Sequence, residues 1–221
     1  MYKRQALLSE AVDLAVHSHK DLETNQPEGL EVVAVSDRAN PADILLIQKD
    51  AYDASKNLGL KEGAIVGTSS ARRKALLNAF RPDAKIKDLR GNVPTRIDKL
   101  RQRNYDAIIL AKAGVSRLEI DLSDFHVEVL KPQEFVPAPA QGVLGLQIRL
   151  NDEKTRAVVS KMNNPDVKSL INIERGVLNK LDGGCQLPLG VYAEKINGKY
   201  EVWTALGPVS YTHLTLPTTP Y

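Results

Sequence analysis

The stretch GAIVGTSSARRKALLNAF, residues 63–80, decides the fold. Its short apolar run predicts a buried strand, and the serines that follow predict the start of a helix. The arrangement recurs downstream, because AKIKDLRG (84–91) and YDAIILAKAG (105–114) predict two further strands with a helical segment at 92–104 between them. Strands that alternate with helices predict a parallel sheet with crossover helices, which is an α/β fold.

The segments on either side of this unit predict a second sheet and a small terminal segment. A helical pattern begins near residue 6, and 38–46 is interpreted as a turn, with Pro41 at a boundary. Asn197-Gly198 predicts the two-residue turn of a hairpin. The remaining expectations are strands at 13–18 and 28–36, a loop and strand at 135–150, helices at 153–164 and 166–181, and the hairpin at 190–206.

Composition is that of a globular protein, with 43% hydrophobic and 26% charged residues. A single cysteine excludes an internal disulfide and favours a reducing compartment, and the four scattered histidines predict no metal site. Residues 1–5 and 208–221 look like translated adapter sequence, and we expect them to lie outside the fold. Without the two basic residues of the first segment, the net charge of +3 falls to +1.

An anion site is predicted where the strand of 63–80 meets its helix. The first amides of a helix are unsatisfied and favour anions, and Thr68, Ser69 and Ser70 add hydroxyl donors there. Arg72 and Arg73 add charge and could bind a carboxylate or phosphate bidentately. The alternative is an ordinary capped helix with solvated arginines.

Two more arginine groups follow the next two predicted strands. Arg90, Asn92 and Arg96 lie at the second strand-to-helix junction, and Arg117 follows the third strand. In an open parallel sheet the ligand crevice lies beyond the carboxyl ends of the strands, so we expect these arginines to converge. They predict one ligand with several anionic groups.

Two shorter features carry candidate chemistry. In HSHKD (17–21), Asp21 beside Lys20 is either a surface ion pair, which these five residues alone favour, or a carboxylate suited to acid–base work. Cys185 follows two glycines in a loop after a helix, a position that favours a reactive thiol over a buried apolar residue.

These features together resemble the porphobilinogen deaminase (hydroxymethylbilane synthase) family. The motifs occur in the family's order from about Ala6 to about Gly207: AVHSHKD, GTSSARR, RPDAKIKDLRGNVPTRIDKL, YDAIILAKAGVSRL, PAPAQGVLGLQIR and ERGVLNKLDGGCQLPLG. The resemblance implies two domains similar to type II periplasmic binding proteins and a small α+β C-terminal domain, incomplete at both ends. We expect the first domain at 6–40 and 137–160, the second at 41–136 and the third at 161–207.

The resemblance also implies roles for the candidate residues. Cys185 would carry a dipyrromethane cofactor through a thioether, and Asp21, preceded by Lys20, would be the catalytic carboxylate. The arginines implied to bind acetate and propionate groups are Arg72, Arg73, Arg90, Arg96 and Arg117. Thr68, Ser69, Ser70, Asn92 and Gln141 match positions that line the same cleft.

The implied activity is a transferase of tetrapyrrole biosynthesis. Four porphobilinogen molecules would be deaminated and joined on the dipyrromethane primer, and hydroxymethylbilane and ammonia would be released. We expect a cytoplasmic monomer with no metal, nucleic acid or membrane partner. Because the family's first strand and glycine-rich turn and the rest of its third domain are not recognised here, we also expect this chain to be inactive and poorly stable.

Two alternatives remain open. A non-catalytic anion-binding module would suit the arginine-lined cleft, but such a module has no use for a thiol after Gly-Gly. A nucleic-acid binder is less consistent with the near-neutral charge and with arginines at strand ends instead of along one helix face.

Overall fold

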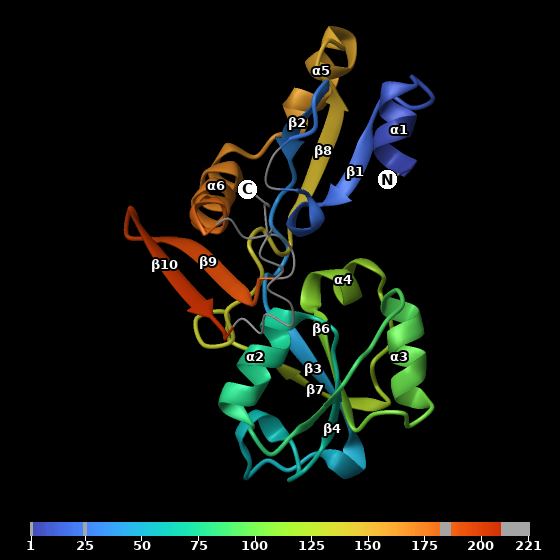
Figure 1. The fold of residues 1–221 in the computed structure, drawn as a ribbon, viewed down its shortest axis with the longest axis vertical. Helices are drawn as coiled ribbons and strands as arrows, with labels where there is room; N and C mark the ends of the chain where they lie inside the picture. Colours follow the sequence, from blue (N-terminus) through green and yellow to red (C-terminus); the bar gives the residue numbers. More distant parts are fainter. Residues whose placement is uncertain (1, 24–25, 182–186, 209–221) are drawn as a thin grey trace, which may run out of the picture.

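The computed structural model describes residues 2–23, 26–181 and 187–208, which form two lobes and a smaller hairpin segment (Figure 1). The first lobe holds an antiparallel sheet in the order β1-β8-β2. Its strands are β1 (Ala15–Ser18), β2 (Leu30–Val35) and β8 (Leu144–Arg149), and its helices are α1 (Tyr2–Leu8), η1 (His19–Asp21), α5 (Glu153–Val159) and η4 (Ser160–Met162).

The second lobe holds a five-stranded sheet in the order β5-β4-β6-β3-β7. The strands are β3 (Asp43–Gln48), β4 (Ile65–Gly67), β5 (Lys85–Lys87), β6 (Ala107–Ala111) and β7 (Phe125–Val129). The helices are α2 (Ala71–Phe80), α3 (Val93–Arg101), α4 (Lys112–Arg117), η2 (Lys49–Ala51) and η3 (Asn57–Gly59). The chain passes between the lobes twice, at 36–42 and 130–143.

The core of the second lobe shows why α2 and α3 cover opposite faces of its sheet (Figure 1). Side chains of a strand alternate between faces, and β3 places Leu45 and Ile47 against Leu77 of α2. Its other face carries Leu46 toward Ile97 of α3. A central strand buried on both faces therefore has a continuous apolar sequence.

The hairpin segment consists of α6 (Pro165–Lys180), β9 (Leu189–Ile196) and β10 (Lys199–Leu206). Asn197 and Gly198 have φ values of 50° and 80°, as a two-residue type I′ turn requires, so the predicted hairpin is confirmed. The strands of each sheet fall within one of the three segments expected from the sequence. The domain boundaries themselves stay a prediction.

The α/β class and the β4-α2-β5-α3-β6 unit are confirmed, because β4 pairs in parallel with both β5 and β6. The parallel arrangement predicted for these three strands is therefore confirmed, although the sheet as a whole is not parallel. Strand β3 lies antiparallel to both β6 and β7, which makes the sheet mixed. The interpretation of 38–46 as a turn is wrong for its second half, where the completely buried run DILLIQ forms β3. Strand β7 and helix α4 were not predicted.

The N-terminal helix lies earlier than the apolar spacing suggested. It spans Tyr2–Leu8, and Glu10 follows it with a φ of 60°, a left-handed conformation that stops a helix. Leu7 is completely buried, whereas Val12 is 40% exposed. Apolar residues beyond Leu8 therefore do not continue the helix, and part of the segment expected to lie outside the fold belongs to α1.

Candidate functional site

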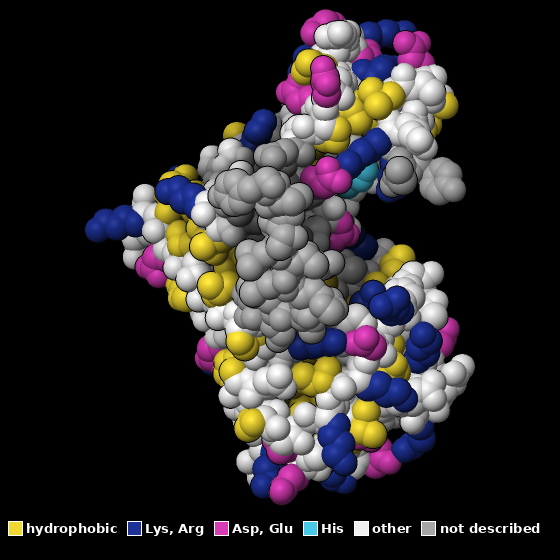
Figure 2. All heavy atoms as spheres, viewed as in Figure 1, with side chains coloured by type: hydrophobic (Ala, Val, Ile, Leu, Met, Phe, Trp, Pro, Cys, Tyr) yellow, Lys and Arg dark blue, Asp and Glu magenta, His cyan; other side chains and the backbone are white. Residues whose placement is uncertain are grey.

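A cleft of about 670 Å³ lies between the two lobes, and both contribute to its lining. Figure 2 shows the hollow between the lobes on the right of the view. Seven of the sequence-predicted site residues line it: Lys20, Asp21, Arg73, Asn92, Arg96, Arg117 and Gln141. The expected convergence of arginines that follow successive strands is therefore confirmed in position for Arg73, Arg96 and Arg117, whereas the site roles of all seven residues stay predictions.

The first lobe contributes the corner formed by Lys20 and Asp21. Strand β1 pairs with β8 up to Ser18, and the 3-10 turn η1 then carries both side chains to the cleft. No described contact pairs Lys20 with Asp21; instead Lys20 Nζ donates to Gln141 Oε1 at 3.3 Å, and Asp21 is exposed. A surface ion pair, favoured by the five residues alone, is therefore not what the described contacts show.

The pKa of Lys20 is lowered to about 8. Burial is the largest cause, and the positive charge of Arg73 is the next. Asp21 and Asp43 act in the opposite direction without cancelling the effect. Lys20 thus loses its charge in a pH range where an ordinary lysine remains protonated.

The second lobe contributes three arginines, one after each of three successive strands. Arg73 belongs to α2 after β4, Arg96 to α3 after β5, and Arg117 to α4 after β6. Backbone carbonyls hold them: Arg73 Nη1 donates to Ile109 O at 3.0 Å, Arg96 Nε to Gly91 O at 2.7 Å and Arg117 Nη2 to Gly142 O at 2.7 Å. Among the described residues, neither Arg96 nor Arg117 has a carboxylate partner. Their charges are therefore available to an anionic ligand.

Asp43, the first residue of β3, is a functional candidate that sequence reasoning missed. Its side chain is completely buried, and Arg72 and Arg73 lie 2.8 and 2.7 Å from its two oxygens. Burial raises the pKa of Asp43, but the two guanidinium groups outweigh it and hold that pKa well below the usual range. In the sequence, Asp43 appears only as a single acidic residue at the start of an apolar run. Its importance becomes clear once Arg72 and Arg73 are seen to be its partners.

Several of the predicted residues hold the local structure, and Asn92 does so while also lining the cleft. Ser70 accepts a hydrogen bond from Arg73 N at 3.4 Å and caps α2, and Asn92 accepts from Thr95 N at 2.9 Å and caps α3. Ser69 Oγ exchanges hydrogen bonds of 3.0 Å with the backbone of Leu89. Thr68 and Arg72 are buried and Arg90 is exposed, and none of the three lines the cleft. Their ligand-binding roles stay predictions.

Cys185 lies outside the described residues, so its predicted role is not tested by the geometry. Within the described part of the chain, no group of three or more His, Cys, Asp or Glu side chains could hold a metal ion. No described helix is long and apolar enough to cross a membrane.

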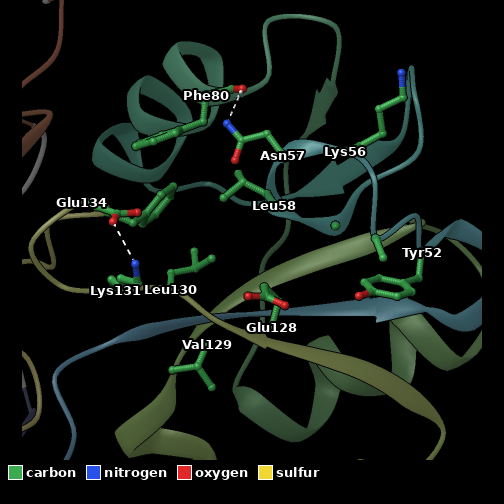
Figure 3. Close-up of a pocket in the computed structure, with 13 residues that line it drawn as sticks. Tyr52, Lys56, Asn57, Leu58, Phe80, Glu128, Val129, Leu130, Lys131 and Glu134 are labelled. Carbon is green, nitrogen blue, oxygen red and sulfur yellow. Dashed lines mark hydrogen bonds and ion pairs between the residues drawn. The ribbon is translucent and has the colours of Figure 1, made fainter.

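A second cavity, of about 360 Å³, lies in the second lobe and contains none of the predicted site residues (Figure 3). Two pairs of polar groups in the lining are hydrogen-bonded to each other, as the dashed lines in Figure 3 show. Lys131 Nζ lies 3.2 Å from Glu134 Oε1, and Asn57 Nδ2 lies 3.3 Å from Phe80 O. The cleft between the lobes is therefore the stronger candidate.

Comparisons with known proteins agree with the predicted family. Residues 3–157 match the dipyrromethane-cofactor-binding domain of porphobilinogen deaminase, and residues 169–206 match its C-terminal domain. The porphobilinogen deaminase of Chlorobium phaeovibrioides is 41% identical over 93% of this chain and 64% of the relative. That of Chloroherpeton thalassium is 39% identical over 92% of this chain and 63% of the relative. The chain thus spans slightly less than two thirds of the length of these relatives.

Solved structures similar to the chain include periplasmic binding proteins. One is an ABC transporter periplasmic binding protein from Brucella ovis, with a TM-score of 0.47 and 16% identity over 71% of this chain and 48% of that one. Another is an arginine-specific periplasmic binding protein of Salmonella typhimurium, with a TM-score of 0.43 and 11% identity over 80% of this chain and 75% of that one. The family is shown by the sequence matches: this chain belongs to the porphobilinogen deaminase family.

Proposed function

We propose that the protein is a transferase that deaminates four porphobilinogen molecules and joins them head to tail on a covalently bound dipyrromethane primer, releasing ammonia and hydroxymethylbilane. The observation that carries this proposal is the cleft, where the Lys20–Asp21 corner and three arginines of the other lobe contribute to one lining. The proposal includes a monomer in a reducing cytoplasm, in keeping with a single cysteine.

The arginines suit the carboxylates of the substrate. Each porphobilinogen carries an acetate and a propionate group, so a growing chain of pyrroles accumulates negative charge. Arg96 and Arg117 are held by backbone carbonyls, which orient the side chains without neutralising them. Guanidinium groups remain charged at every physiological pH and can bind carboxylates bidentately. Several such groups along one cleft can hold several pyrrole units.

Asp21 suits the deamination step. When the aminomethyl group of porphobilinogen loses ammonia, positive charge develops on the substrate. A carboxylate already in place stabilises that charge without reorganising. Asp21 is exposed in the cleft and forms no close ion pair among the described residues, so it can face the reacting substrate.

The donor set of the cleft also fits a dipyrromethane group, because two pyrrole rings with their carboxylates need arginine and amide donors near one another. Arg73, Arg96, Arg117 and Asn92 are the side chains that would hold it. When bound, the group supplies the nucleophilic pyrrole carbon to which substrate is joined. Cys185 would be its point of attachment.

Intact-mass measurement after incubation with porphobilinogen tests the proposal, with the unaltered chain and its Cys185→Ser variant each extended to the full length of the relatives, because this chain spans slightly less than two thirds of them. We expect the unaltered chain to gain the mass of two linked pyrrole units and the Cys185→Ser chain to gain none, because the serine hydroxyl is a much poorer nucleophile than a thiolate. Circular dichroism of both proteins confirms that they are equally folded. A folded unaltered chain that gains no mass would contradict the proposal and favour a non-catalytic anion-binding module.

Porphobilinogen affinity should depend on the charge of Lys20. Since the pKa of Lys20 is lowered to about 8, its charge is present below that pH and lost above it. We expect the affinity to fall by about tenfold between pH 7 and pH 9, equivalent to about 1.4 kcal/mol. Lys20→Arg keeps the charge and should flatten this dependence. Titration calorimetry at several pH values measures the porphobilinogen affinity of both proteins. The same pH dependence in both would exclude Lys20 as the titrating group.

A further inference from the structure

Asp43, Arg72 and Arg73 form a buried charged cluster, and the family resemblance implies no role for Asp43 in it. The exposed fraction is 0% for Asp43, 5% for Arg72 and 6% for Arg73. Asp43 Oδ1 accepts from Arg73 Nη2 at 2.7 Å, and Arg72 Nη1 lies 2.8 Å from Oδ2. Removing charged groups from water costs free energy, so a buried cluster of this kind calls for a functional explanation.

Gln141 connects this cluster to the other lobe's corner of the cleft. Its Nε2 donates to Asp43 Oδ1 at 2.9 Å and to Pro41 O at 2.7 Å, and its Oε1 accepts from Lys20 Nζ at 3.3 Å. The side chain of Asp43 therefore receives donors from α2 and from the second connection between the lobes. One carboxylate faces two guanidinium groups, with the ammonium of Lys20 nearby, so the cluster keeps a net positive charge.

Asp43 is also a shared partner of the two guanidinium groups. Neighbouring residues of a helix point about 100° apart, so Arg72 and Arg73 would diverge without a shared partner. Each has a second anchor, as Arg72 Nη1 donates to Val136 O at 2.9 Å and Arg73 Nη1 to Ile109 O at 3.0 Å. Arg73 lines the cleft, and its buried Nε has no hydrogen-bond partner among the described residues. A buried donor without a partner is costly and is satisfied when a ligand accepts from it.

We propose that Asp43 is a positioning residue, which fixes Arg73 so that the guanidinium group offers a donor to a carboxylate bound in the cleft. This deepens the proposed function and rests on it for the identity of the natural ligand. A positioning residue and a plain counter-ion can be told apart, because their removal changes the affinity for an anion in opposite directions. Removing a counter-ion makes the site more positive and tightens anion binding, whereas removing a positioning residue weakens binding despite the added positive charge.

Succinate is the probe, because it carries two carboxylates and no pyrrole. We expect Asp43→Asn, which keeps the side-chain shape, to bind succinate about tenfold more weakly than the unaltered chain in titration calorimetry. Asp83→Asn is the matched control, since Asp83 pairs with Arg81 on the same lobe at 2.7 Å and is absent from the cleft lining. The succinate affinity of Asp83→Asn should equal that of the unaltered chain. Succinate binding by Asp43→Asn that equals or exceeds that of the unaltered chain would overturn the proposal, as would no binding by the unaltered chain.

A second variant covers the case in which Asp43→Asn does not fold, as thermal unfolding would show. Arg73→Lys keeps the charge but cannot reach Asp43, the carbonyl of Ile109 and a ligand at once. We expect its succinate affinity to fall by about fivefold, and an unchanged affinity would overturn the proposal. Porphobilinogen is titrated separately. If the unaltered chain binds succinate but not porphobilinogen, the proposed function is contradicted. The succinate affinities of the variants still test the role of Asp43.

Discussion

Asp21→Ala should lower the rate of ammonia release from porphobilinogen by roughly 100- to 1,000-fold while leaving substrate affinity within about threefold. The expected split follows from the geometry of the cleft. In the proposed function the carboxylate groups of the substrate bind to arginines of the second lobe, whereas Asp21 lies on η1 of the first lobe. Removing it takes away stabilisation of the positive charge that develops as the amine leaves, and leaves the anion-binding groups in place. Ammonia release under saturating substrate measures the first effect, and calorimetry measures the second.

The rate is measured in a chain extended to the full length of the relatives, because this chain spans slightly less than two thirds of them. Asp13→Asn is a suitable control, since Asp13 is a carboxylate of the same lobe whose side chain is 73% exposed and pairs with Arg149 away from the cleft. Its rate should match that of the unaltered protein. An Asp21→Ala protein that releases ammonia at the unaltered rate would remove Asp21 from the proposed role.

Local sequence signals predicted the second lobe well. Residues 71–80 form the helix α2 with Ser70 as its cap, because the cap and the strand before it lie within a few residues of one another. The convergence of Arg73, Arg96 and Arg117 followed from a general rule about parallel strand ends, which holds for β4, β5 and β6. Signals of this kind depend on neighbours in the sequence or on a topology that the sequence pattern itself indicates.

The errors have a different physical origin. Strand β3 was interpreted in part as a turn because Asn40-Pro41 suggested a break, and its continuous apolar run shows no alternation. Its antiparallel direction comes from the connection between the lobes, which a local pattern does not reveal. Asp43 could not be matched to Arg72 and Arg73 because about 30 residues separate them. Contacts across lobes, such as that of Lys20 with Gln141, depend on the assembled fold.

Glu174→Ala is expected to destabilise the protein by roughly 3–5 kcal/mol, which is the usual cost of removing one partner from a buried ion pair. Glu174 is completely buried on α6, and its oxygens accept from Arg38 Nη1 and Nη2 at 2.7 and 3.2 Å. They also accept from the backbone N–H groups of Ala140 at 2.7 Å and Ala193 at 2.8 Å. Arg38 and Ala140 belong to the two connections between the lobes, and Ala193 to β9. One carboxylate therefore joins both connections to the hairpin segment, so its loss should also loosen the cleft.

Urea unfolding of two further variants separates the charge from the backbone hydrogen bonds. Glu153→Ala removes a glutamate that is 81% exposed and pairs with Arg156 at 3.4 Å, and surface pairs of this kind contribute at most about 1 kcal/mol. The double variant Arg38→Met/Glu174→Met removes both charges and should recover part of the loss. It should remain less stable than the unaltered protein, because two buried N–H groups stay unpaired at about 1–3 kcal/mol each. If Glu174→Ala unfolds at the same urea concentration as Glu153→Ala, the buried carboxylate does not hold the connections together.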